Sequence, residues 1–144
     1  MIEVLRLNHR IFRDKRISTH VALVARAFKA NKIYYTGQKD NSLEESVSKV
    51  VKKHGGRFEI NHVKDYREAV KSKKVVHLTI KGEDFKNKIN ELKEIENLIV
   101  IVGGEKVPVE IYKIANYNLS VTKEPHSEVG ALAVFLDHLN NQNL

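Results

Sequence analysis

The run Leu98–Val102 constrains the fold of this chain more than any other segment. All five residues are apolar and four are β-branched, which is typical of a strand buried on both faces in a parallel sheet covered by helices. Gly103, Gly104 and Pro108 end the strand. Because glycine lets a backbone come close to a ligand, residues 103–105 form a candidate ligand loop at the carboxyl edge of a sheet. An ordinary strand-to-helix turn is the alternative.

Strand-like and helix-like segments alternate along the rest of the chain. Strands are predicted at 1–7, 32–36, 58–63, 75–80, 98–102 and 118–121. Helices are predicted at 18–28, 42–54, 66–73, 85–92 and 109–115, with a last one after residue 127. Ser18 or Thr19, Ser42 and Ser127 are the predicted caps of the first, second and last helices. The pattern predicts the α/β class, with a mostly parallel sheet flanked by helices in a single domain over residues 1–144.

The charge of the chain points to an acidic partner. With 25 basic and 18 acidic residues, the formal net charge is +7, and nucleic acid fits it better than a membrane because no amphipathic basic helix is present. A merely basic surface is the alternative. There is no cysteine, and the chain begins with a strand-like run rather than a signal peptide, so we expect a cytoplasmic protein without a membrane segment.

Common catalytic signatures are missing from the sequence. It lacks the phosphate-binding loop, the G-x-G-x-x-G fingerprint and the G-x-S-x-G elbow. It also lacks the H-E-x-x-H pair of zinc ligands, so we expect no metal. Three loops after strands remain, at 8–16, 103–107 and 121–128, and in a parallel sheet they share one edge and can converge. The first carries Arg10, Arg13 and Arg16, which taken alone are better explained as a solvated basic loop, the commoner outcome for a run of charges.

Five blocks of residues, taken together, resemble the archaeal tRNA cytidine-56 2′-O-methyltransferases. The blocks are Leu-Arg-Leu-Asn-His-Arg at 5–10, Arg-Asp-Lys-Arg at 13–16, Thr-His-Val-Ala-Leu at 19–23, Val-Gly-Gly-Glu-Lys-Val-Pro at 102–108 and Pro-His-Ser-Glu-Val at 125–129. That family belongs to the SPOUT class. The resemblance implies a C-terminal trefoil knot, S-adenosylmethionine as methyl donor, tRNA as substrate and a homodimer.

The resemblance also implies which residues hold the cofactor. They lie at the end of one strand, in the loop after the central strand and in the segment before the last helix: Leu78, Gly103, Gly104, Glu105, Lys106, Val107, Val121, Thr122, Lys123, Glu124, Pro125, His126, Ser127 and Glu128. Related enzymes commonly have Ser-Leu-Asn-Val where this chain has His126-Ser127-Glu128-Val129. Members of the class can continue into a basic C-terminal segment, so we expect RNA contacts made there to be supplied elsewhere.

The resemblance places an arginine of the first motif at the reacting ribose. Because a guanidinium stays protonated, we expect it to clamp a phosphate and stabilise the developing alkoxide rather than act as a base. Arg16 is the predicted residue, with Arg10 and Arg13 as phosphate holders; Arg26 and His20 are the alternatives for this position. Methyl transfer to another RNA position, a catalytically silent RNA-binding module and a generic nucleotide-binding protein are the competing hypotheses.

Overall fold

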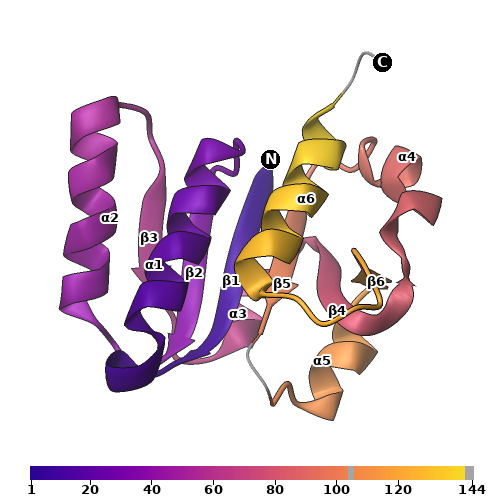
Figure 1. Cartoon of the computed structure of the whole chain (residues 1–144), viewed down its shortest axis with the longest axis horizontal. Coiled ribbons are helices and arrows are strands. Elements are labelled where there is room, and N and C mark those ends of the chain that lie inside the picture. The colour runs from indigo at the N-terminus through magenta and orange to yellow at the C-terminus, as the bar shows by residue number, and fades with distance from the viewer. Residues whose placement is uncertain (104–105, 142–144) are drawn as a thin grey trace.

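The computed structural model describes residues 1–103 and 106–141, which fold around one six-stranded sheet (Figure 1). The strands are β1 (Ile2–His9), β2 (Lys32–Gly37), β3 (Glu59–His62), β4 (Lys74–Asp84), β5 (Leu98–Val102) and β6 (Tyr117–Ser120). Their order across the sheet is β3-β2-β1-β5-β4-β6, and each neighbouring pair is parallel. The predicted α/β class with a mostly parallel sheet is therefore confirmed, with β5 in the interior.

Helices cover both faces of the sheet. They are α1 (Ile11–Ala27), α2 (Asn41–His54), α3 (Tyr66–Val70), the 3-10 turn η1 (Phe85–Asn87), α4 (Ile89–Leu92), α5 (Val109–Ile114) and α6 (Glu128–Asn140). α1, α2 and α6 lie on one face, and α3 and α5 lie on the other (Figure 1). No helix in the described ranges is both long enough and apolar enough to cross a membrane.

The alternation along β5 supplies a core to each helical layer. Val100 and Val102 belong to the larger cluster, with residues of α1, α2 and α6. Ile99 and Ile101 belong to the smaller cluster, with Ala69 of α3 and Ile111 of α5. Because successive side chains of a strand point to opposite faces, a fully apolar strand requires cover on both sides.

The first helix begins earlier than predicted. The prediction of a loop over residues 8–16, with Ser18 or Thr19 as a cap, is wrong because α1 begins at Ile11 and Arg10 occupies the capping position. Asp14, within the first turns, accepts the backbone N–H of Arg10 at 3.0 Å. A carboxylate is also favoured near a helix N-terminus, so Asp14 supports a start upstream of Ser18.

Other boundaries also differ from their predictions, among them the start of α2 and the end of β4. Asp40, not Ser42, caps α2, and its side chain accepts from the backbone N of Leu43 at 3.1 Å. β4 continues to Asp84 rather than ending at residue 80, with an irregular register against β6 between Leu78 and Glu83. The predicted Ser127 cap of α6 is confirmed, because its Oγ accepts from the backbone N of Gly130 at 3.0 Å.

Strand register places the site at the carboxyl edge of the sheet. Arg6 of β1 pairs with Val102, the last residue of β5, and Leu78 of β4 pairs with Leu119 of β6. β1 continues past Arg6 to His9, which pairs with Gly37 at the end of β2. The ends of β1, β2 and β5 and the middle of β4 therefore lie at the edge of the sheet from which α1 starts and beside which the segment before α6 runs.

Candidate functional site

Two pockets adjoin at the carboxyl edge of the sheet, and Lys106 lines both. The first, here the arginine pocket, has a volume of about 470 Å³ and is lined by Arg6, Asn8, His9, Arg10, Arg13, Asp14, Gly37, Gln38 and Lys106. The second, here the Gly103 pocket, has a volume of about 580 Å³. The predicted convergence of three segments that follow strands is confirmed, because each of them contributes residues to these two pockets.

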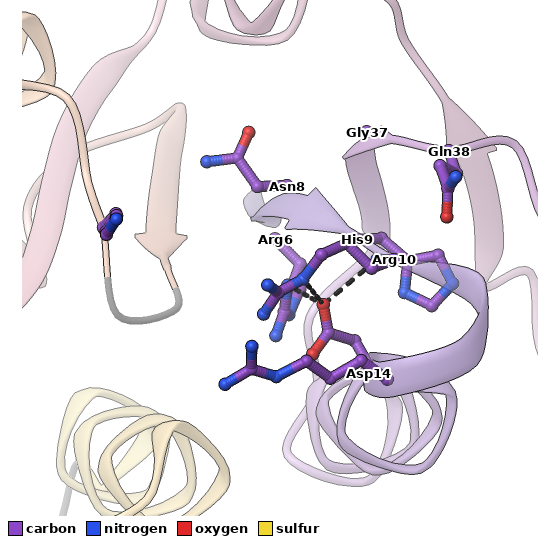
Figure 2. A pocket seen from close by; sticks show the side chains of 9 residues that line it. Arg6, Asn8, His9, Arg10, Asp14, Gly37 and Gln38 are labelled. Atoms are coloured by element: carbon purple, nitrogen blue, oxygen red, sulfur yellow. Dashed lines mark hydrogen bonds and ion pairs between the residues drawn. The ribbon is translucent and has the colours of Figure 1, made fainter.

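One carboxylate organises the cations of the arginine pocket (Figure 2). Asp14 Oδ2 accepts from Arg10 N and Arg10 Nε, both at 3.0 Å, and lies 4.0 Å from Arg6 Nη1. Burial by itself would raise the pKa of Asp14, but the hydrogen bonds from Arg10 and the charge of Arg6 outweigh it and hold the pKa below its usual value. Asp14 is therefore ionised at neutral pH, and the pocket keeps an excess of positive charge.

A buried histidine fixes the strand end beside this pocket. His9 Nδ1 lies 2.6 Å from Ser18 Oγ and His9 Nε2 lies 2.8 Å from Asp40 Oδ2. The three side chains resemble the set of a serine hydrolase, but Ser18 is buried inside α1 and has no access for a substrate. The cluster instead ties β1, α1 and the start of α2 together, which fixes the first part of α1, where Arg10 and Arg13 line the pocket.

The Gly103 pocket lies between the middle of β4, the end of β5 and the segment before α6. It is lined by His77, Leu78, Thr79, Ile80, Lys81, Val102, Gly103, Lys106, Val107, Val109, Tyr112, Pro125, His126, Glu128 and Ala131. A Cβ placed on Gly103 would lie 2.5 Å from Val107 Cγ2, so any larger residue here requires the Val107 side chain to shift. Because glycine has no Cβ, a ligand can come close to the Gly103 backbone.

Polar groups from β4 and α5 lie along one side of the Gly103 pocket. The hydroxyls of Thr79 and Tyr112 are 3.1 Å apart, and the Tyr112 ring meets the His77 ring edge-on at 4.8 Å. Burial lowers the pKa of His77 more than its hydrogen bond with Asn118 raises it. His77 is therefore neutral at pH 7 and contributes no charge to this pocket.

An ion pair joins the two pockets. Arg6 Nη2 lies 3.2 Å from Glu128 Oε2; Arg6 lines the arginine pocket and Glu128 lines the Gly103 pocket. Burial raises the pKa of Glu128, and the nearby Asp14 raises it further, while the Arg6 charge acts in the opposite direction. Among the described residues, no group of three His, Asp or Glu side chains comes together as metal ligands would.

The predicted site residues divide into three groups. Arg10 and Arg13 line the arginine pocket; of the predicted cofactor residues, Leu78, Gly103, Lys106, Val107, Pro125, His126 and Glu128 line the Gly103 pocket. Arg16 is exposed on α1 and lines neither pocket. The same two pockets are also not lined by five of the predicted cofactor residues: Val121, Thr122, Lys123, Glu124 and Ser127. Lys123 instead donates to the carbonyl oxygens of Ile80 and Gly82. The predictions for Gly104 and Glu105 lie outside the described residues.

Sequence reasoning missed Arg6, which is 2% exposed. A charge between two leucines, Leu5 and Leu7, in a predicted strand was the available signal, because a buried arginine needs acidic partners. Thr79 and Tyr112 carried no such signal, since hydroxyl residues are common in strands and helices.

Comparison with known proteins identifies one family of relatives. Residues 54–144 match the family model described as tRNA ribose 2′-O-methyltransferase, aTrm56. The chain is 52% identical over 139 residues to the tRNA (cytidine(56)-2′-O)-methyltransferase of Picrophilus torridus, covering 95% of this chain and 40% of that protein. It is 51% identical over 146 residues to the protein of the same name from Methanocaldococcus jannaschii, covering 96% of this chain and 81% of that protein.

A solved structure shares the fold at low sequence identity. The SpoU methyltransferase AviRb from Streptomyces viridochromogenes, solved in complex with the cofactor AdoMet, matches with a TM-score of 0.66 and 12% identity. The match covers 96% of this chain and 56% of AviRb. At this identity the similarity concerns the fold alone.

Proposed function

Because the chain belongs to the aTrm56 family of tRNA ribose 2′-O-methyltransferases, we propose that it methylates the ribose 2′-hydroxyl of cytidine 56 in tRNA, using S-adenosylmethionine. The observation that carries the proposal is the pair of adjoining pockets. One is lined by arginines, which suit phosphates, and the other opens onto the backbone of Gly103, which suits a nucleoside cofactor. The names of the curated relatives support the nucleotide position, and the cofactor in AviRb supports the methyl donor.

The Gly103 pocket is the proposed cofactor site. S-adenosylmethionine, when bound, supplies a methyl group activated by a positively charged sulfur. Gly103 would offer its backbone, while Leu78 and Val107 offer apolar contact and the hydroxyls of Thr79 and Tyr112 offer hydrogen bonds. Glu128 fits a cationic cofactor because its carboxylate retains a buried oxygen, Oε1, without a hydrogen-bond partner in the described structure.

The remaining predicted cofactor residues stay part of the proposal in a supporting role. Lys123 bonds to the backbone of β4, and Ser127 caps α6, so both shape the segment that carries Pro125 and His126 along the pocket. Val121, Thr122 and Glu124 belong to the same segment. Gly104 and Glu105 follow Gly103 in the sequence and are proposed to belong to the same ligand loop.

The arginine pocket is the proposed RNA side of the site. Arg10, Arg13 and Lys106 would hold phosphates, because lysine and arginine neutralise the nucleic-acid backbone. Arg16 is proposed to clamp the phosphate next to the reacting hydroxyl. Since it is exposed on α1, this role requires RNA that extends over that helix. A tRNA loop suits such a surface, because its unstacked bases and shape can be read.

We also propose that residues 1–144 act as one domain, as a homodimer, in the cytoplasm, with the trefoil knot implied by the resemblance. Phe12 is fully exposed at the start of α1, and Ile17 is exposed further along it. Large apolar side chains on a surface mark interaction sites, which supports a partner surface beside the arginine pocket.

Transfer of labelled methyl from S-adenosylmethionine to an unmodified tRNA transcript tests the proposed function. The control is a matched transcript with a 2′-deoxy residue at cytidine 56. We expect label on the first and none on the second. Equal labelling of both would exclude this position and favour another nucleotide. Cofactor and RNA binding without transfer to any transcript would contradict the reaction, and RNA binding alone would favour a silent RNA-binding module.

A further inference from the structure

The Arg6–Glu128 ion pair forms a shared wall between the two pockets, because Arg6 lines the arginine pocket and Glu128 lines the Gly103 pocket. The residues are 122 positions apart in sequence, and they approach because β1 pairs with β5 while α6 begins beside the strand ends. The Arg6 side chain is 2% exposed and the Glu128 side chain 19% exposed. Neither partner is therefore screened by water as a surface pair would be.

Both members of the pair have an unused polar atom. Arg6 Nε and Glu128 Oε1 are buried and have no hydrogen-bond partner in the described part of the chain. Buried polar atoms are nearly always satisfied, and each exception calls for an explanation. That two of them belong to one ion pair, and that each residue lines a different pocket, points to ligands on the two sides of the wall.

The charges around the pair indicate which ligands these are. Glu128 is the one acidic side chain among the described residues lining the Gly103 pocket, where Lys81 and Lys106 are the cations. On the other side, the only described acid is Asp14, which is already bound by Arg10. A positive group therefore fits beside Glu128, and a negative group fits beside Arg6.

We propose that Glu128 binds a positive charge of the cofactor, and that this frees Arg6 to bind a phosphate of the RNA in the arginine pocket. The inference rests on the proposed function, because the cation is the sulfonium or the ammonium group of S-adenosylmethionine. When a cation of the cofactor also binds the Glu128 carboxylate, the ion pair between Glu128 and Arg6 weakens. The guanidinium then has donors available for an anion, and cofactor binding strengthens RNA binding.

Thermodynamic linkage makes this coupling measurable in either direction. If the cofactor raises the affinity for RNA by some factor, RNA raises the affinity for the cofactor by the same factor. A purely structural ion pair would change stability when broken, but it would not link the two affinities.

The first experiment measures the binding of S-adenosylmethionine and S-adenosylhomocysteine by calorimetry. Glu128→Gln is compared with the wild type and with Glu45→Gln, an equal change of charge at an exposed position of α2. We expect Glu128→Gln to weaken S-adenosylmethionine binding by about tenfold or more and Glu45→Gln to leave it unchanged. S-adenosylhomocysteine lacks the sulfonium charge, so an equal loss for both ligands assigns the ammonium group, and a loss confined to S-adenosylmethionine assigns the sulfonium.

The second experiment measures RNA affinity with and without saturating S-adenosylmethionine, on a transcript with a 2′-deoxy residue at cytidine 56 so that no transfer occurs. We expect the cofactor to raise RNA affinity by about fivefold or more in the wild type and not in Glu128→Gln. Glu128→Asp keeps the charge but is too short to hold Arg6 in the same way. It should bind S-adenosylmethionine nearly as well as the wild type with reduced coupling, and it serves as the test if Glu128→Gln does not fold.

The outcomes separate the two proposals. A wild-type protein that binds no S-adenosylmethionine would overturn the proposed function, and with it this inference. The role of Glu128 alone would be overturned if the wild type binds the cofactor and a folded Glu128→Gln binds S-adenosylmethionine and S-adenosylhomocysteine as tightly as the wild type does. RNA affinity that is independent of the cofactor in the wild type would overturn the coupling.

Discussion

Asp14 Oδ2 accepts both the backbone N–H and the Nε–H of Arg10, each at 3.0 Å. The same oxygen lies 4.0 Å from Arg6 Nη1. One buried acid therefore sets the first turn of α1 and orients two arginines of the arginine pocket. Because the interactions converge on one atom, the start of the helix and the geometry of the pocket depend on each other.

Asp14→Asn is expected to lower the free energy of unfolding by roughly 2 to 4 kcal/mol, because it leaves the buried Arg6 charge with Glu128 as its only acidic partner among the described residues. Urea denaturation at pH 7 measures the change. Asp137→Asn, at an exposed position of α6, is the matched control and should stay within about 0.5 kcal/mol of the wild type. Equal stability of the two variants would show that the charge of Asp14 contributes little.

Asp40→Asn is expected to make the free energy of unfolding depend less on pH in the acid range. Burial would raise the pKa of Asp40, but its hydrogen bonds with His9 and Leu43 outweigh burial and hold the pKa below the usual 3.8. A carboxylate with a depressed pKa contributes stability that is present above its usual pKa and is lost as pH falls through the folded-state value. Asparagine can still cap α2, so the variant isolates the charge.

The measurement for Asp40→Asn is the free energy of unfolding at several pH values from neutral down to acid. We expect a smaller decrease below about pH 4 in the variant than in the wild type. Parallel curves for the two proteins would mean that Asp40 has the same pKa folded and unfolded.

Gly103→Ala is expected to weaken S-adenosylmethionine binding by about tenfold, because the new Cβ would lie 2.5 Å from Val107 Cγ2 and displace this side chain, which lines the pocket. Calorimetry measures the affinity and thermal denaturation monitors the fold. The double variant Gly103→Ala/Val107→Ala removes the clashing methyl group and should recover part of the binding lost, measured against Val107→Ala alone. Unchanged affinity in the single variant would exclude a role for Gly103 in cofactor binding.

Arg13→Gln is expected to weaken tRNA binding and to reduce the slope of log affinity against log salt by about one, since one phosphate contact is lost. Arg57→Gln is the control: it removes an equal charge at an exposed position after α2, and it should leave the slope unchanged. Filter binding over a series of salt concentrations measures both. An identical slope in the Arg13 variant and the wild type would remove Arg13 from the RNA surface.

Arg16→Gln tests the arginine predicted to act at the reacting ribose. We expect methyl transfer to fall by about tenfold or more with the affinity for S-adenosylmethionine unchanged, because a charged hydrogen bond to the phosphate would be lost. Single-turnover transfer to the tRNA transcript gives the rate. Transfer at the wild-type rate would reassign the clamping role to Arg10 or Arg13, which line the arginine pocket.

The sequence was most informative where a pattern repeats over neighbouring residues. The apolar run of β5 predicted an interior strand with its bounds correct, and Ser127 predicted the start of α6. It was least informative at the first helix, where Ser18 offered a plausible cap. In the folded chain Ser18 is a buried partner of His9, and Asp14 supports an earlier start. Both residues were visible in the sequence, but their partners depend on how β1 and α1 pack together.

The sequence by itself determined the α/β class, the central strand and the three segments that meet at the carboxyl edge, because periodicity and glycine position are local properties of the chain. Only the tertiary structure decided that Arg6 is buried, that it shares Glu128 with the opposite pocket, and that Lys106 lies between the two pockets. The physical reason is distance along the chain. A contact between residues 122 positions apart follows from strand order and helix packing, which no local pattern records.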